Sequence, residues 1–374
     1  MKRFLVLSLA FFVSLLFAGV ALDDPSVAIA VEASQAQEAT QGFDCADVTQ
    51  IPQSECEALV TFYYATGGDG WLNDDGWLAT NTPCEWFGIT CSAGHVTGLT
   101  KDDALVGNIP PEVAHLSHLR LLVLRGAETG VNGLSGIIPP ELGTLSQLET
   151  FKLGHNLDVS IPPELGNLSS LHTLQITAAV APTDAGELLD RLLRNGDSTL
   201  PPELGNLSNL QSLQISHSVG GTIPPELGNL ANLEVLNVGL NALTGSVPPE
   251  LGNLTNLTHL RLGTWHSGCS GVAPMPSLSG PLPAELGNLY YLHVLDVSCQ
   301  SLDGPMPMTF TNLVELEHLH YENNRYAFAV GLHLCEPESL KFQLWIDGVP
   351  SVEPSPGIIC GWNNYQLYLP VVMR

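Results

Sequence analysis

Residues 201–215 read PPELGNLSNLQSLQI, and the same phrase returns with few changes at residues 139–153, 162–176 and 224–238. Where copies follow one another directly, their starting points lie 23 or 24 residues apart. A fixed period of this length is typical of a solenoid, in which each repeat is one structural unit stacked on the next. The repetition therefore predicts the fold before any single residue is considered.

Each copy carries the alternation of a half-buried strand. In the quoted copy, Leu213 and Ile215 point to one face of an extended chain, whereas Ser212, Gln214 and Ser216 point to the other. One copy alone leaves its apolar face exposed to water. The copies must therefore stack, and their strands form a parallel sheet. The second proline of the Pro-Pro pair, like the first, has no backbone N–H to donate to a β-sheet, so the pair marks the side of the repeat where the chain returns. There it begins a short helical turn. The pattern predicts about nine strands, centred on Leu99, Leu122, Phe151, Leu174, Leu213, Leu236, Leu260, Leu295 and Leu319.

The fuller copy, NLANLEVLNVGLNALTGSVPPELG, resembles the plant-type leucine-rich repeat, L-x-x-L-x-x-L-x-L-x-x-N-x-L-(S/T)-G-x-(I/V)-P. The segment before the repeats is similar to that family's N-terminal cap at Trp71, Trp77, Cys84, Trp86, Gly88 and Cys91. The resemblance implies an α/β repeat solenoid, a right-handed leucine-rich repeat superhelix with a parallel concave β-sheet and disulfide-bonded caps. Receptor-kinase ectodomains and polygalacturonase inhibitors share these repeats, and the family binds proteins, peptides or glycans on its inner or lateral face. No kinase sequence follows the repeats, so we do not expect a receptor kinase.

The chain divides into five parts. Lys2 and Arg3 precede an apolar run that ends in small residues, which predicts a signal peptide over residues 1–21. An uncleaved membrane anchor is the alternative, because the run is only slightly shorter than a membrane span. We expect a secreted or cell-surface monomer without a stable membrane span after cleavage. The remaining parts are a flexible linker (22–42), the N-terminal cap (43–95), the repeats (96–327), and a C-terminal cap and tail (328–374).

Eight cysteines in a secreted chain imply disulfide bonds. The family resemblance implies a cap bridge between Cys84 and Cys91. Local spacing suggests that Cys45 pairs with Cys56 and Cys335 with Cys360, which leaves Cys269 for Cys299. No C-x-x-C spacing occurs in the sequence, so a zinc site made of cysteines is not expected.

Charge and motifs exclude several classes of function. The formal net charge of −26 disfavours nucleic acid and anionic membranes as partners. The sequence has no G-x-S-x-G, no HExxH, no phosphate-binding glycine loop and no aspartate-rich calcium loop, so we expect neither an enzyme nor a cofactor. His318, His320 and Glu322 alternate on one strand and could hold a metal. We interpret them instead as part of a solvated outward face.

The candidate ligand-binding residues lie at outward strand positions and in one long loop. The repeat spacing is stretched in three places, after Ala127, Ala178 and Trp265, and these loops should leave from the same rim of the sheet. The central outward column varies in charge while the inward leucines hardly change, which favours a recognition surface. The candidate residues are Arg125, Lys152, Gln175, Gln214, Asn237, Arg261, Trp265, His266, Asp296 and His320.

Two classes of function remain open. The first is a secreted recognition module for a protein, peptide or glycan, and the second is a structural cell-surface spacer without a defined ligand. Arg125, Lys152 and Arg261 are outward cations in an acidic chain, which indicates a partner with carboxylate groups. The alternative is that these cations only offset neighbouring acids in exposed pairs, each worth under about 1 kcal/mol.

Overall fold

The computed structural model describes residues 43–126, 133–134, 136–156, 160–178, 198–263, 277–321, 324, 343–346 and 349–350. The chain forms two compact units, Met1–Val48 and Thr49–Arg374. In the first unit, the described residues include the short 3₁₀ helix η1 (Cys45–Asp47), where the Asp44 side chain accepts a hydrogen bond from the Ala46 backbone N–H. The following paragraphs concern the second unit.

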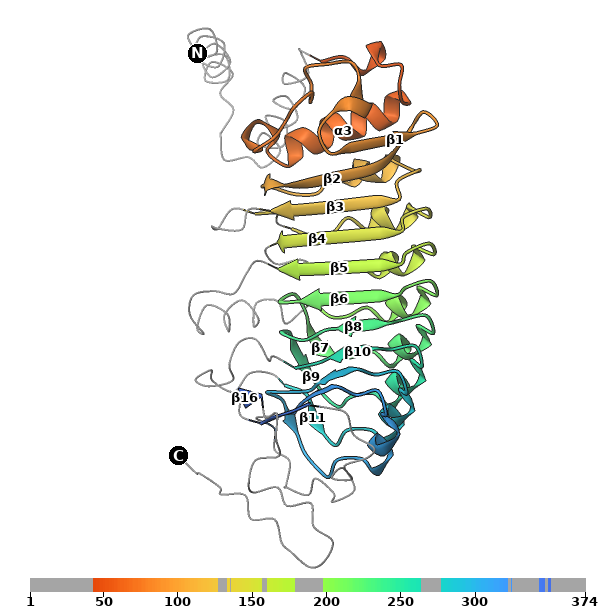
Figure 1. The fold of residues 1–374 in the computed structure, drawn as a ribbon. Helices are drawn as coiled ribbons and strands as arrows, with labels where there is room; N and C mark the ends of the chain where they lie inside the picture. The colour runs from red at the N-terminus through yellow and green to blue at the C-terminus, as the bar shows by residue number, and fades with distance from the viewer. Residues whose placement is uncertain are drawn as a thin grey trace, which may run out of the picture. The chain divides into compact units, whose positions relative to one another are not determined.

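The expected strands lie side by side, in chain order, in one sheet (Figure 1). Each pairs in parallel with the next, and the predicted strand centres from Leu99 to Leu319 are direct register partners. The prediction of a solenoid with a parallel sheet is therefore confirmed. The strands are β2 (His95–Leu105), β3 (Leu121–Gly126), β4 (Thr150–Asn156), β5 (Thr173–Ala178), β6 (Ser212–Ser216), β8 (Val235–Asn237), β10 (His259–Arg261), β12 (Val294–Asp296) and β14 (His318–His320).

The sheet is longer than the repeats alone predict. Strand β1 (Ile89–Ser92) pairs antiparallel with β2, and β15 (Gln343–Ile346) pairs in parallel with β14. Strand β16 (Val349–Pro350) then pairs antiparallel with β15, which makes twelve strands in all. Strands outside the repeat pattern thus extend the main sheet at both of its ends.

The core is a column of apolar side chains on the inner face of this sheet. The predicted strand centres are fully buried from Leu99 to Leu295, and Leu319 is 2 % exposed. Burial of each such leucine removes apolar surface from water and contributes roughly 2 kcal/mol. Because every centre packs against its counterparts in the neighbouring repeats, no repeat is stable without the others.

Short 3₁₀ helices form the return side of each repeat, as the proline pairs predict. In η9, Pro224 is the N-cap and Pro225 the first helical residue, where the missing N–H of proline would have no partner in any case. Figure 1 shows these turns stacked along the sheet. They are η4 (Pro111–His115), η5 (Pro140–Thr144), η6 (Pro163–Asn167), η8 (Pro202–Asn206), η9 (Pro225–Asn229), η10 (Pro249–Asn253), η12 (Ala284–Asn288) and η13 (Met308–Asn312).

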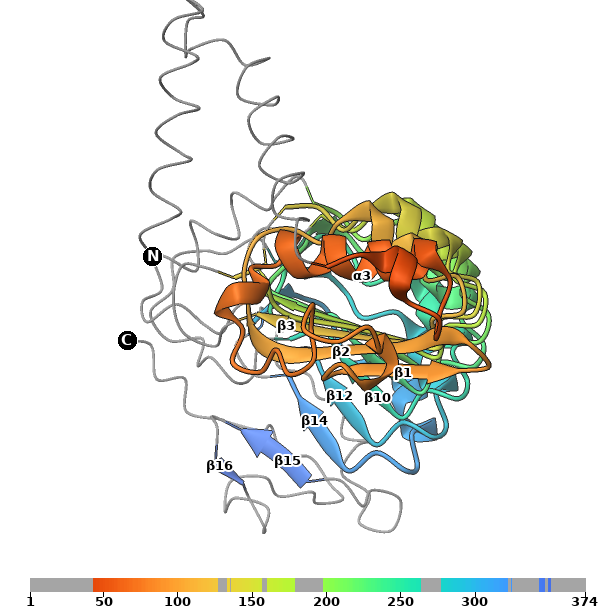
Figure 2. The same cartoon turned by 90° about the horizontal axis from the view of Figure 1, so that it is seen from above.

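Helix α3 (Gln53–Ala65) covers the first end of the stack, where it packs against η4 (Figure 2). Cys84 and Cys91 form a disulfide bond, with Cα atoms 5.5 Å apart, between η3 (Pro83–Glu85) and β1. Three buried tryptophans pack close by, and the Trp77 ring centroid lies 4.9 Å from those of Trp71 and Trp86. These residues cover the first leucine layer of the core, which would otherwise be exposed to solvent.

Lys101 on β2 departs from the repeat pattern. It is fully buried at an inward strand position that Leu124 and Leu153 occupy in the next two strands. Its Nζ lies 4.0 Å from the Trp71 ring centroid and donates a hydrogen bond to the Asn73 carbonyl oxygen. The cation is thus held by an aromatic face and a backbone acceptor, which compensate in part for its lost hydration.

Two further pairs of strands, separate from the main sheet, were not predicted. Strand β7 (Gly220–Thr222) pairs with β9 (Ala242–Thr244), and β11 (Ser279–Gly280) pairs with β13 (Ser301–Leu302). These strands lie at or beside the Leu-(Ser/Thr)-Gly part of the repeat. Gly245, directly after β9, has a φ of 79°, which favours glycine. The signal was present in the sequence but lies outside the L-x-L pattern.

Several predicted features lie outside the described residues. These are the signal peptide and linker, the three long loops after β3, β5 and β10, and most of the C-terminal segment. In the part of the chain that the structure describes, no helix combines the length and the apolar character needed to cross a membrane.

Candidate ligand-binding face

Outward side chains form a continuous row across the parallel strands, which we call the central column. Its members are direct register partners from one strand to the next, as the repeat pattern predicts. We call the sheet surface that carries them the open face. The central column consists of Val123, Lys152, Gln175, Gln214, Asn237, Arg261, Asp296 and His320.

The middle of the open face is polar and accessible. From Lys152 on β4 to Arg261 on β10, every member of the central column keeps some exposure to solvent. Small hydroxyl side chains flank it, with Thr173 and Thr177 beside Gln175 on β5. Because the inward neighbours of these residues are buried apolar side chains, the backbone beneath the polar row is held rigidly.

Cations at one end of this surface have different surroundings. Arg125 forms an ion pair with Asp102 on the neighbouring strand, at 3.2 Å between Nη1 and Oδ2, and both side chains are well exposed. The Lys152 side chain has neither a hydrogen bond nor an ion pair with any residue that the structure describes. The two cations share a shallow hollow lined also by Gly154, Gln175 and Thr177. A side chain at position 154 would press on the Arg125 aliphatic stem at 3.2 Å, so glycine keeps the hollow open.

Arg261 marks the far end of the accessible column. It is exposed, and its side chain has no hydrogen bond or ion pair with the described part of the chain. Its neighbour His259 is partly buried, and this burial lowers the pKa of the imidazole below its ordinary value of 6.5. The nearby charge of Arg261 lowers that pKa further. Near neutral pH His259 is therefore uncharged, and Arg261 supplies the positive charge on β10.

Comparison with known proteins supports what these repeats indicate. The leucine-rich repeat family model matches residues 232–254. A probable inactive receptor kinase from Arabidopsis thaliana is 38 % identical over 91 residues, which are 24 % of this chain and 13 % of that protein. The leucine-rich repeat ectodomain of the receptor kinase GASSHO1/SCHENGEN3 from the same plant, solved in complex with CASPARIAN STRIP INTEGRITY FACTOR 2, is 28 % identical. It has a TM-score of 0.55 and covers 70 % of this chain and 28 % of that one.

The chain carries leucine-rich repeats and is similar to the ectodomains of plant receptor kinases. It spans 13 and 14 % of the length of the first two curated relatives that it matches, both described as probable inactive receptor kinases. A plant ice-binding protein also shares the fold, with a TM-score of 0.52, 82 % of this chain covered and 20 % identity.

The leucine-rich repeat structure corrects two members of the central column. Asp296 is 4 % exposed, and its Oδ1 accepts hydrogen bonds from the Ser298 backbone and hydroxyl groups. His320 is 6 % exposed, so our interpretation of it as part of a solvated face is wrong. Both residues occupy outward register positions but are covered by their surroundings. The accessible column therefore ends at Arg261.

Other predicted site residues have mixed outcomes. Trp265 and His266, together with Glu322 of the histidine-rich strand, lie outside the described residues. Cys45, Cys56 and Cys299 are each in a disulfide bond. Cys269, Cys335 and Cys360 fall outside the described part of the chain, so their pairing stays a prediction.

The sequence analysis did not predict a groove that lies where strands β8, β10 and β12 begin. Its aromatic member, Tyr291, is 60 % exposed, and the adjacent Tyr290 is 50 % exposed. Asn232 and Asn256 form part of its wall and donate hydrogen bonds to the preceding repeats, at 2.8 Å from the Ser208 and Ala231 carbonyl oxygens. The variable residue just before each L-x-L segment was the available signal. The groove is lined by Gln211, Asn232, Glu234, Asn256, Thr258, Tyr291 and His293.

Proposed function

We propose that this leucine-rich repeat protein is a secreted or cell-surface recognition module, without catalytic activity. It binds an extended partner that carries carboxylate groups, such as an acidic peptide or glycan, along the accessible part of the central column. It acts as a monomer. This reading is preferred to a structural spacer, for which uniform small polar residues would be sufficient.

The observation that carries the proposal is the contrast between the two faces of one sheet. Inward positions repeat large apolar side chains, mostly leucine, whereas the outward row runs through lysine, glutamine, glutamine, asparagine and arginine in register. A rigid scaffold beneath a varied polar row is the arrangement that binding surfaces require, because little conformational entropy is lost on binding.

The two cations without described ion pairs set the chemistry and the length of the partner. Lys152 and Arg261 are separated by four strand steps, or about 19 Å at ~4.8 Å per strand. An extended peptide covers that distance with roughly six residues. Arg125 contributes less than the sequence suggests, because Asp102 already neutralises much of its charge. The partner that fits best therefore carries two acidic groups about six residues apart.

The comparison with the plant receptor ectodomain supports this reading, because that ectodomain was solved with its factor bound. The similarity covers 28 % of that ectodomain and supports ligand binding as the general kind of function. The choice of partner in this chain depends on the residues of the open face, which differ between repeats.

The test uses a synthetic peptide with glutamates six residues apart and its glutamine counterpart, measured by calorimetry at low salt. We expect the glutamate peptide to bind and the Lys152→Ser/Arg261→Ser variant to lose that binding with an unchanged melting temperature. Arg120→Ser is the control, because Arg120 is an exposed cation paired with Glu149 just before β3. Equal binding by the double variant would exclude the central column. Absence of binding by any acidic peptide or oligogalacturonate would favour the spacer.

A further inference from the structure

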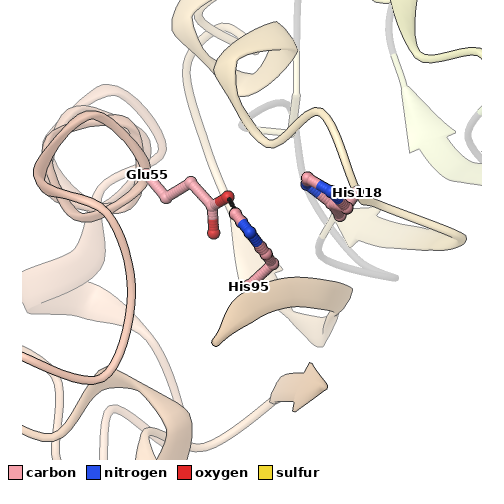
Figure 3. Close-up of side chains that lie close together, drawn as sticks. All are labelled: Glu55, His95 and His118. Carbon is pink, nitrogen blue, oxygen red and sulfur yellow. Dashed lines mark hydrogen bonds and ion pairs between the residues drawn. The ribbon is translucent and has the colours of Figure 1, made fainter. Parts of the chain in front are cut away.

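A glutamate and two histidines meet at the seam between the cap and the first repeat (Figure 3). Glu55 lies on helix α3, His95 begins strand β2, and His118 lies in the turn that follows η4. Each offers one ligand atom, and the three atoms lie within 4.8 Å of one another. None of these residues belongs to the open face.

The carboxylate of this group is held in place before any ion arrives. Glu55 is only 2 % exposed, and one of its oxygens accepts a hydrogen bond from the Val96 backbone N–H at 2.7 Å. The other oxygen lies 2.6 Å from Nδ1 of His95. The ring of His118 stacks on that of His95, with centroids 3.7 Å apart and an angle of 20° between the planes. Figure 3 shows the two rings side by side, with the carboxylate of Glu55 next to that of His95.

The donor set selects a class of ion. Two imidazole nitrogens and one carboxylate oxygen suit zinc and similar transition metals, whereas calcium and magnesium prefer oxygen ligands alone. Donor atoms around tetrahedral zinc are about 3.3 Å apart at bond lengths of ~2.0–2.1 Å. The stacked imidazole rings must therefore turn relative to each other so that one nitrogen of each ring faces the ion. The His95 side chain is 32 % exposed, which leaves a position open to water.

We propose that Glu55, His95 and His118 bind one zinc-class divalent cation, with water as the remaining ligand. The ion takes the place of the hydrogen bond between Glu55 and Nδ1 of His95, and each histidine binds it through an unprotonated ring nitrogen. Because the ligands come from the cap helix, the first repeat strand and the first return turn, the ion ties the cap to the solenoid. Binding to the folded chain alone then raises its stability by mass action.

The test uses the full chain without an affinity tag, treated with a chelator and then titrated with zinc chloride by calorimetry. We expect one high-affinity equivalent, and cobalt should give the visible absorption of a four-coordinate site. His118→Ala should weaken zinc binding by at least about tenfold, the factor that corresponds to 1.4 kcal/mol. The matched control is His115→Ala, which removes an exposed histidine three residues earlier on η4.

Circular dichroism of the metal-free proteins separates a lost ligand from a lost fold. His118 packs at the surface, so the metal-free His118→Ala variant should keep its melting temperature, and added zinc should raise that of the wild type only. If His118→Ala does not fold, His118→Gln replaces it with a side chain of similar size. Equal zinc affinity in the folded His118 variant and in His115→Ala would overturn the proposal, as would a wild type that binds no zinc.

Discussion

Individual buried polar side chains connect neighbouring repeats. Asn241 is 7 % exposed and follows strand β8. Its Oδ1 accepts hydrogen bonds from the Ser218 and Val219 backbone at 3.0 and 3.2 Å, and its Nδ2 donates to the Ile215 and Val238 carbonyl oxygens at 2.7 and 2.8 Å. Asn324 makes the same kind of bridge, and Gln300 replaces asparagine by accepting from Leu278. One side chain thus satisfies backbone groups of two repeats.

Replacing Asn241 with alanine should lower the free energy of unfolding by at least about 2 kcal/mol, because several buried backbone groups would lose their partner. Asn232→Ala is the control, since exposed Asn232 makes a single bond to the Ser208 carbonyl oxygen and should cost under about 1 kcal/mol. Urea unfolding followed by circular dichroism measures both. Equal losses would show that the bridge adds little beyond an exposed hydrogen bond.

His259 should make the stability depend on pH. Its pKa in the folded chain lies below the ordinary value of 6.5, first because of burial and then because of Arg261 and His293, while Glu317 opposes them. Above pH 6.5 the imidazole is neutral in both states and contributes nothing. As the pH falls below 6.5, the unfolded chain takes up the proton first, so the free energy of unfolding decreases until the folded pKa is passed.

The direction can be measured by an NMR titration of the His259 ring, which should give a midpoint below 6.5. His259→Gln should reduce the loss of stability between about pH 7 and pH 5, compared with the wild type and with His115→Gln. A midpoint at or above 6.5 would contradict the partly buried environment of His259 in the structure.

At the scale of an element, the return turns depend on close backbone approach. Gly228 in η9 is buried against the carbonyl of Glu250 in η10, and a Cβ atom at position 228 would lie well inside van der Waals contact with that oxygen. The same contact recurs at Gly143, Gly166, Gly205 and Gly252. The glycine of the PELGN segment is therefore a packing requirement between neighbouring turns.

Gly228→Ala should destabilise the protein by about 1–3 kcal/mol, because neither backbone can move without disturbing its own repeat. Gly70→Ala is the matched control, since a Cβ at that exposed position meets no atom within 4 Å. Thermal unfolding should show a lower midpoint for Gly228→Ala than for Gly70→Ala. The packing argument fails if both variants melt together.

At the scale of the whole molecule, the ends of the solenoid need protection because each repeat is completed only by its neighbours. The cap supplies this at the first end through α3, the tryptophan cluster and the Cys84–Cys91 bond. Loss of this protection should start unfolding at the cap and propagate along the stack.

The Cys84→Ser/Cys91→Ser variant should therefore lose roughly 2–4 kcal/mol, the value expected when a short disulfide loop is opened. Hydrogen exchange should rise first in residues 53–105 and only later in the repeats. Ser92→Ala, at the exposed position next to Cys91, should leave both measurements unchanged. Uniform loss of protection along the chain would mean that the cap and repeats unfold as one unit.

The features that repeat can be predicted from the amino-acid sequence alone. The spacing of Leu213 and Ile215, copied from repeat to repeat, was sufficient to predict the parallel sheet and the register that aligns Lys152, Gln175 and Gln214. The physical reason is that the same local requirement, burial of two alternating apolar side chains, applies in every copy. Stacking identical units leaves only one register that keeps all of them buried.

Which side chains are covered, and which ones meet, depends on the three-dimensional packing of the chain. Asp296 and His320 follow the outward pattern yet are buried, and Arg125 is paired with Asp102 from the adjacent strand. Glu55 and His95 are 40 residues apart in the chain and come from elements with no shared period. Such contacts depend on how the cap, the loops and individual rotamers settle against the stack, and a pattern that is local to one repeat contains no information about them.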